Sequence, residues 1–412
     1  MHQLSEGLLR SALLALLATG CGGAPSPATT EANPRASCEA GDAGACLELG
    51  RAYETGVGEE MDDAHAVALY EQACEGGEPR GCTALGTRYY VGRGVASDPV
   101  RARNLFNRGC EGGDLFGCYN QAIALLRPPA GEEPDPARAA SLFERACEGP
   151  VVAACNNLGM LRESGVGGGR DREGAEALYT RGCDGGDPGA CHNLAVLLEH
   201  GPNASTGATR AAELYERACE ANVGASCARL GTLYEEGRGV TQDLARALSI
   251  YQAACEAGQA EPCVNLGALY AAGHGVEADP ARARTYFEGA CTDDERAGCL
   301  ALGQLNEAAE DYDNARLCFE RGCEGGQLGA CVALGSLYST ARGVEQDHGR
   351  AGELFERSCR AGSGIGCFNL AAAFASGTGV PRDRERARVL FQQACELGEQ
   401  RACQVIAAPS NP

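Results

Sequence analysis

Residues 227–262 read CARLGTLYEEGRGVTQDLARALSIYQAACEAGQAEP, and the same pattern recurs along most of the chain. A cysteine opens each copy at intervals of 36 or 37 residues, with one interval of 32. Ten copies cover 357 of the 412 residues. A period of this length is typical of repeat proteins, whose units stack on their neighbours to form one continuous core.

Each copy predicts two helices. The first pattern, C-x-x-L-G-x-x-Y, places apolar residues at i, i+3 and i+7, which is one face of a helix. The glycine in it removes a side chain where a second helix must pack closely; these glycines are Gly50, Gly86, Gly159, Gly231, Gly267, Gly303 and Gly335. The second pattern, A-x-x-L-Y-x-x-A-C, predicts the returning helix. Neither helix can bury its apolar stripe alone, so the sequence predicts an α-solenoid.

The connection between the two helices has its own signals. A G-x-G-V turn ends the first helix, because glycine tolerates the left-handed C-cap conformation. An aspartate then stands where an N-cap is favoured: Asp62, Asp98, Asp135, Asp171, Asp243, Asp279, Asp347 and Asp383. Three copies are irregular. Residues 127–135 lengthen one turn, residues 201–207 replace another, and the 32-residue copy (299–330) should have a tighter turn.

This repeat resembles the Sel1-like repeat, a relative of the tetratricopeptide repeat, and with C-x7-C between units it resembles the secreted, cysteine-rich branch of that family. The resemblance implies an all-α, right-handed α-solenoid of about ten 36-residue helix-turn-helix repeats. It also implies a scaffold that contacts proteins mainly through its concave face. Some secreted cysteine-rich members have been assigned penicillin-binding or β-lactamase activity, which makes such an activity the alternative function.

The C-x7-C spacing accounts for 22 of the 24 cysteines. In each pair the first cysteine ends a second helix and the next opens the following first helix, so a disulfide can close each corner. Zinc is the rival, but there is no C-x-x-C and there are few histidines. The predicted pairs are Cys38 with Cys46, Cys74 with Cys82, Cys110 with Cys118, Cys147 with Cys155, Cys183 with Cys191, Cys219 with Cys227, Cys255 with Cys263, Cys291 with Cys299, Cys323 with Cys331, Cys359 with Cys367 and Cys395 with Cys403.

Two cysteines remain. Cys318 occupies a position where most copies have leucine, so we expect it to act as a small buried hydrophobe, with a reactive thiol as the alternative. Cys21 ends the stretch Leu17-Ala18-Thr19-Gly20-Cys21, which resembles a bacterial lipobox and implies lipidation of the Cys21 thiol after cleavage. A plain secretory signal cut elsewhere is the alternative.

The two ends of the chain complete the expected organisation. The apolar run Ser11–Gly20 is too short to span a membrane and is typical of a signal peptide. We expect a signal peptide at 1–20, a lipidated cysteine and disordered tether at 21–37, the solenoid at 38–403 and a disordered tail at 404–412. The glycines after Cys21, by resemblance to lipoprotein sorting rules, favour the outer membrane, with a lipid anchor as the only membrane contact.

Composition excludes several functions. All 35 basic residues are arginine, and 56 acidic residues give a net charge of -21. Nucleic-acid binding is therefore not expected. The absence of lysine removes Schiff-base chemistry, a P-loop and the Ser-x-x-Lys nucleophile. The six histidines are scattered, with no H-E-x-x-H. We predict no catalytic residue, no metal and no cofactor, so an enzymatic function rests on the family resemblance alone.

Two rows of polar residues remain as candidate binding features. Asparagines lie two positions after the opening cysteine in five copies: Asn120, Asn157, Asn193, Asn265 and Asn369. Their shared register predicts a row on one face of the first helices, and the resemblance implies that this is the concave face. An amide there can both donate to and accept from a peptide backbone. The alternative is that each bonds only a neighbouring turn.

The second row follows the helix-ending cysteine: Glu75, Glu111, Glu148, Asp184, Glu220, Glu256, Glu324 and Glu396. An acid at a helix C-terminus opposes the helix dipole. This row is either an acidic ridge for a basic partner or a solubilising edge. The sequence thus predicts an envelope lipoprotein that binds proteins or peptides; a spacer that binds nothing through its groove is a further alternative.

Overall fold

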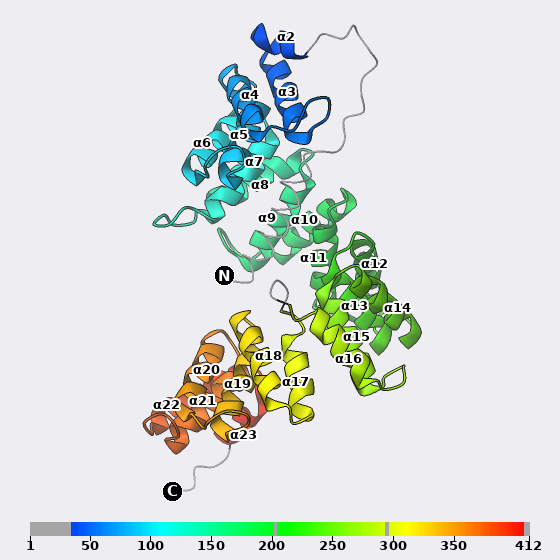
Figure 1. The fold of residues 1–412 in the computed structure, drawn as a ribbon, viewed down its shortest axis with the longest axis vertical. Coiled ribbons are helices and arrows are strands. Elements are labelled where there is room, and N and C mark those ends of the chain that lie inside the picture. The colour runs from blue at the N-terminus through cyan, green and yellow to red at the C-terminus, as the bar shows by residue number, and fades with distance from the viewer. Residues whose placement is uncertain (1–33, 202–203, 293–295, 408–412) are drawn as a thin grey trace. The chain divides into compact units, whose positions relative to one another are not determined.

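The computed structural model describes residues 34–201, 204–292 and 296–407. It consists of helices, which alternate between two types along the chain (Figure 1). The first helices of the repeats are α3 (Ala43–Thr55), α5 (Pro79–Val91), α7 (Leu115–Leu126), α9 (Val152–Ser164), α11 (Pro188–Glu199), α13 (Gly224–Glu236), α15 (Ala260–Ala272), α17 (Cys299–Ala308), α19 (Leu328–Thr340), α21 (Gly364–Ser376) and α23 (Gln400–Ala407).

The second helices run back beside them. They are α2 (Pro34–Glu39), α4 (Asp63–Glu75), α6 (Pro99–Glu111), α8 (Pro136–Glu148), α10 (Arg172–Asp184), α12 (Ala204–Glu220), α14 (Leu244–Glu256), α16 (Pro280–Gly289), α18 (Tyr312–Glu324), α20 (His348–Arg360) and α22 (Arg384–Glu396). The helix-turn-helix repeats predicted from the sequence are thus confirmed, including the short one, α17–α18.

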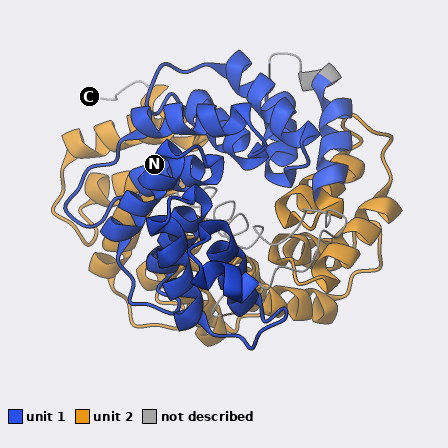
Figure 2. Cartoon of the chain, turned by 90° about the horizontal axis from the view of Figure 1, so that it is seen from above, with its two compact units in different colours: residues 1–218 blue, residues 219–412 orange. Residues whose placement is uncertain are grey.

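The chain divides into two compact units, residues 1–218 and 219–412, which Figure 2 colours separately. Within each unit, helices adjacent in sequence pack against each other, and first helices of successive repeats also touch, as α5 and α7 or α13 and α15 do. In the described part of the chain the backbones of successive second helices lie farther apart, and arginine side chains bridge them. Each unit therefore has a first-helix face on the inner side of its stack and a second-helix face on the outer side.

The predicted glycines do permit close helix packing. A Cβ on Gly86 would lie 2.8 Å from the Phe106 ring, and one on Gly335 would lie 2.7 Å from the Phe355 ring. Phe106 and Phe355 are 2% and 7% exposed, so these rings form the centre of each repeat. The hairpin core is therefore a large aromatic side chain seated where the opposite helix has no side chain.

The helix boundaries are set by caps. All eight predicted aspartates are N-caps of second helices, each accepting a backbone N–H two or three residues ahead. The first helices, however, begin three residues before their cysteine in every described repeat except α17, so the cysteine does not open them as predicted. Additional caps that the sequence analysis missed, such as Asp42, Asp114 and Asp187, accept the backbone N–H groups there.

The predicted turn is also present. Among the described first helices, six end on a glycine in the left-handed region, for example Gly237 at φ 68° and Gly377 at φ 80°. In the short repeat three residues, 309–311, join α17 to α18, whereas seven residues, 273–279, join α15 to α16. The expectation of a tighter turn is therefore confirmed, and Glu310 adopts φ 59° within it.

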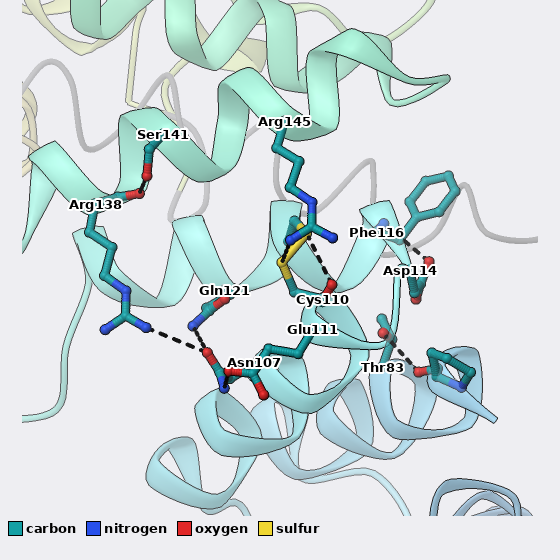
Figure 3. The surroundings of a disulfide bond; sticks show 12 residues. Thr83, Asn107, Cys110, Glu111, Asp114, Phe116, Gln121, Arg138, Ser141 and Arg145 are labelled. Carbon is teal, nitrogen blue, oxygen red and sulfur yellow. Dashed lines mark hydrogen bonds between the residues drawn. A yellow bond between two sulfur atoms is a disulfide. The ribbon is translucent and has the colours of Figure 1, made fainter. Parts of the chain in front are cut away.

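Each predicted cysteine pair forms a disulfide at the corner between two repeats. Cα–Cα distances run from 4.4 to 4.8 Å, and Figure 3 shows the corner that Cys110 and Cys118 close. Both cysteines of that corner are buried, so the bond belongs to the core and also fixes the step to the next repeat. The other disulfides are Cys38 with Cys46, Cys74 with Cys82, Cys147 with Cys155, Cys183 with Cys191, Cys219 with Cys227, Cys255 with Cys263, Cys291 with Cys299, Cys323 with Cys331, Cys359 with Cys367 and Cys395 with Cys403.

The turn after α19 has a residue other than glycine in the left-handed conformation. Ala341 occupies the left-handed C-cap position that glycine holds in the other turns of this kind, with φ 57°. A Cβ in this conformation costs about 1–2 kcal/mol. We predict that Ala341→Gly raises stability against urea by up to about 1 kcal/mol, since the gain is partly offset by greater freedom of the unfolded chain. Ala372→Gly, within a helix, should instead lower it; an unchanged or lower midpoint for Ala341→Gly would contradict the assignment.

Candidate functional site: the first-helix face

The five predicted asparagines differ mainly in their hydrogen bonds, since all except Asn157 are half-buried. Asn157 is fully buried and donates from Nδ2 to the Tyr119 hydroxyl at 3.3 Å. Asn193 donates to Oδ1 of Asn156 at 2.8 Å, and Asn265 is hydrogen-bonded with the Tyr251 hydroxyl. These three amides hold neighbouring helices together. The structure therefore leaves Asn157 out of the predicted binding row, because a fully buried side chain cannot contact a ligand while the fold is intact.

Asn120 and Asn369 are half-buried on α7 and α21. Asn369 makes no side-chain hydrogen bond to any described residue and lies at a hollow of about 260 Å³ between α19, α20 and α21. Phe355 and Ala351 form part of its apolar floor, and polar groups come from His348 and Ser339. This hollow is where the structure brings a predicted row residue together with space for a ligand. The binding role of the row stays a prediction.

Polar contacts between the helices include a pairing that the sequence analysis missed. In four of the described repeats the central ring is a tyrosine, and its hydroxyl donates to a glutamate sixteen residues earlier; the pairs are Tyr70–Glu54, Tyr179–Glu163, Tyr215–Glu199 and Tyr251–Glu235. Where the ring is phenylalanine in repeats of the same length, the earlier position holds Tyr90, Ala271, Ser339 or Ala375. A buried hydroxyl needs an acceptor, which explains the co-occurrence.

Burial of these hydroxyls also changes their ionisation. Desolvation, with the Glu163 carboxylate nearby, raises the pKa of Tyr179 well above its usual value. Desolvation raises the pKa of Tyr251 to about 12. These tyrosines are therefore neutral hydrogen-bond donors at physiological pH and are not available as general bases.

The acidic row lies on the second helices. All eight carboxylates are exposed. Arginines from the following repeat cap the carbonyl groups at these helix C-termini. Arg217 donates to the Cys183 carbonyl at 2.9 Å, and Arg357 donates to the Cys323 carbonyl at 3.0 Å. Arg217 also lies 3.8 Å from Asp184. A cation at a helix C-terminus is favourable, so the structural cost of the acids is offset across the repeat boundary.

This arginine position recurs at two residues before the helix-ending cysteine. Arg108, Arg181 and Arg321 also donate to carbonyls of the preceding corner, at 3.3, 3.0 and 3.4 Å. In Figure 3 Arg145 instead points at the Cys110 sulfur, 3.8 Å away. The corners between repeats are therefore held by a disulfide and, in these repeats, by a charged hydrogen bond.

Cys318 is the free cysteine of the described residues and is half-buried. Asn306 donates from Nδ2 to its sulfur at 3.7 Å. Burial raises the pKa of the Cys318 thiol above its usual value, although Arg321 lowers it in part. The side chain is thus less enclosed than the expected buried hydrophobe, because neighbouring polar side chains replace part of the core around it.

No group of three His, Cys, Asp or Glu residues in the described part of the chain could hold a metal ion. None of the helices described is both long and apolar enough to cross a membrane. Cys21 and the predicted signal peptide lie outside the described residues. The lipid anchor and the outer-membrane localisation therefore stay predictions.

The stacked helix hairpins define the chain as an α-solenoid of tetratricopeptide-like repeats, a type of protein that generally binds other proteins. The model of the Sel1 repeat matches nine segments, residues 43–78, 79–114, 118–150, 152–187, 188–223, 224–259, 263–294, 329–363 and 364–399. The chain belongs to the Sel1 repeat family. No curated protein matches it in a sequence search.

Two solved structures are similar to this chain, and the first of them shares its fold. A protective antigen of uropathogenic Escherichia coli is 24% identical, with a TM-score of 0.57 over 91% of this chain and 83% of that chain. A Sel1 repeat protein from Oxalobacter formigenes is 22% identical, with a TM-score of 0.49 over 56% of this chain and 97% of that chain. At these identities the similarity is one of fold.

The arginine at the repeat corner gives a testable prediction. Arg357→Ala removes a charged hydrogen bond to a helix end, which should lower the free energy of unfolding by about 1–2 kcal/mol. Arg360→Ala, on the same helix, removes only the exposed pair with Glu356 and should change it by less than about 0.5 kcal/mol. Urea unfolding of the oxidised protein, followed by circular dichroism, measures both; equal effects would contradict a capping role.

Proposed function

We propose that this protein is a lipid-anchored lipoprotein of the bacterial envelope that binds proteins or peptides along its first-helix face. The observation that carries the proposal is the hollow between α19, α20 and α21, where the Asn369 amide has no hydrogen-bond partner among the described residues. Family membership supports a scaffold role in general. The corner disulfides are consistent with an oxidising compartment outside the cytoplasm.

The chemistry of the hollow fits an extended polypeptide. Asn369 can donate to a peptide carbonyl and accept from a peptide N–H, which a hydroxyl or a charged group does less evenly. Ala372 and Ser376 present small side chains on the same helix, so a backbone can approach closely. The exposed acidic row lies on the second helices and not at this hollow, so a basic partner at that row is not part of this proposal.

The β-lactam-hydrolysing alternative is not proposed. The chain has no lysine for a Ser-x-x-Lys nucleophile. The described residues offer no metal cluster in its place. The comparisons give that activity no support, so no observation favours it over the binding role.

Site-specific photo-cross-linking tests the binding role. A benzophenone amino acid at Ala372, which is exposed at the hollow, should give a discrete adduct in living cells of the natural host. The same residue at Gln393, exposed on second helix α22, is the control and should give none. Asn369→Ala should reduce the Ala372 adduct about two- to tenfold, since one hydrogen bond contributes about 0.5–1.5 kcal/mol.

The outcomes distinguish binding from a spacer. No adduct at Ala372, or equal adducts at Ala372 and Gln393, would contradict binding through the first-helix face. Asn157→Ala is the matched stability control, because its amide bonds Tyr119 in the interior. It should lower stability, whereas Asn369→Ala should leave the unfolding midpoint unchanged.

The anchor is tested separately. Cells labelled with a clickable fatty acid should attach it to this protein, and Cys21→Ser should abolish the label and release the protein from the membrane fraction. Labelling that persists in Cys21→Ser, or a protein that never carries fatty acid, would contradict the lipoprotein assignment. The scaffold proposal does not depend on this result.

A further inference from the structure

The short repeat, α17–α18, departs from the pattern that other repeats share at one corner. In five of the described repeats an arginine near the start of the second helix stacks on an aromatic ring at the end of the first, for example Arg101 on Tyr89 at 4.3 Å and Arg350 on Tyr338 at 4.6 Å. The corresponding positions in the short repeat hold Asn314 and Asn306. Residues 295–328 are also the longest stretch between the Sel1 repeat matches.

A third substitution lies beside these two. Cys318 occupies the position of the buried Leu69 and Leu105 of other repeats. Replacing a ring by Asn306 and a leucine by Cys318 removes side-chain volume, and the structure has a hollow of about 270 Å³ there, between α16, α17 and α18. A position that departs from the pattern of most repeats is a candidate for a functional site.

Polar side chains that line the hollow are fixed by hydrogen bonds to one another. Asn306 is 2% exposed, and its Oδ1 accepts from Nη1 of Arg284 at 2.6 Å. Its Nδ2 donates to the Cys318 sulfur, so both halves of the amide are used and its orientation is fixed. The Arg284 guanidinium is therefore anchored at the hollow by one nitrogen and has further N–H donors.

Two arginines are among the described residues that line the hollow. Arg284 and Arg321 line it, and Glu288 is the one carboxylate among its described lining residues. Arg321 is tied at its Nη1 to the Cys291 carbonyl at 3.4 Å, which holds the second cation in position. Among the described residues that line the hollow, guanidinium groups therefore outnumber carboxylates by two to one.

We propose that this hollow binds a small ligand through an oxyanion group, a carboxylate or a phosphate, held by Arg284, with Arg321 on the same wall. Planar guanidinium groups match such oxyanions with paired hydrogen bonds. The apolar side chains of Leu302 and Leu317 would contact the rest of the ligand, and the volume limits it to the size of a metabolite. Its residues come mainly from second helices α16 and α18, so this site is separate from the first-helix face.

The reactivity of the Cys318 thiol can report whether the hollow is occupied. In the full chain with Cys21→Ser, the other cysteines are in disulfides and Cys318 is the single thiol. Its alkylation by neutral iodoacetamide is measured with acetate or inorganic phosphate, each compared with chloride at equal ionic strength. At a probe concentration about ten times Kd, alkylation should slow about tenfold. Saturable protection by acetate identifies carboxylate binding, and protection by phosphate identifies phosphate binding.

Two matched variants make the test specific. Arg284→Gln keeps an N–H donor for Asn306 but removes the charge, and should abolish protection. Arg282, two residues away on α16, donates to the Tyr270 hydroxyl and does not line the hollow. Arg282→Gln should therefore leave the protection of Cys318 unchanged. Each variant is compared with itself with and without probe, because the substitution also shifts thiol reactivity. No saturable protection by either anion, or equal protection in both variants, would overturn the proposal.

Discussion

The structure depends on the contact between a ring on each second helix and a position without a bulky side chain on the first. Where that position is glycine, as at Gly50 against Tyr70 or Gly303 against Phe319, a Cβ would overlap the ring. This contact sets the spacing within each hairpin and buries the largest side chain of the repeat. Three repeats have Ala122, Ala195 or Ala371 at the same position, so a methyl group is accommodated where the helices adjust their separation.

The second constraint acts between hairpins. A hairpin of about 25 ordered residues buries little surface alone, and its stability comes from its neighbours. Disulfides close each corner, and arginines such as Arg217 and Arg357 bond the carbonyls of the corner before them. These links join nearest neighbours only, so the stability of each unit is built repeat by repeat rather than from one central core.

Much of this was predictable because the signals are local and repeated. The helices, the aspartate caps, the glycine turns and the cysteine pairs each depend on residues close together in sequence. The pairing of Tyr179 with Glu163 was also visible in principle, since comparing repeats shows that tyrosine and glutamate occur together sixteen residues apart. Burial was not predictable in the same way. Asn157 and Asn369 share a register, yet Asn157 is enclosed because the preceding repeat offers Tyr119 as its partner.

The repeats also serve as internal controls for one another. A feature that recurs, such as an arginine stacked on an aromatic ring, is explained by the packing that every repeat needs. A feature that occurs in few repeats and leaves the core less well packed is not explained by that common need. In the short repeat Asn306 and Cys318 stand where six other repeats have an aromatic ring and most have leucine, and Asn306 is fixed by Arg284. Stability alone would favour the apolar residues found in most of the other copies. The polar cluster at Asn306 is therefore the feature of this repeat that the proposed ligand would account for.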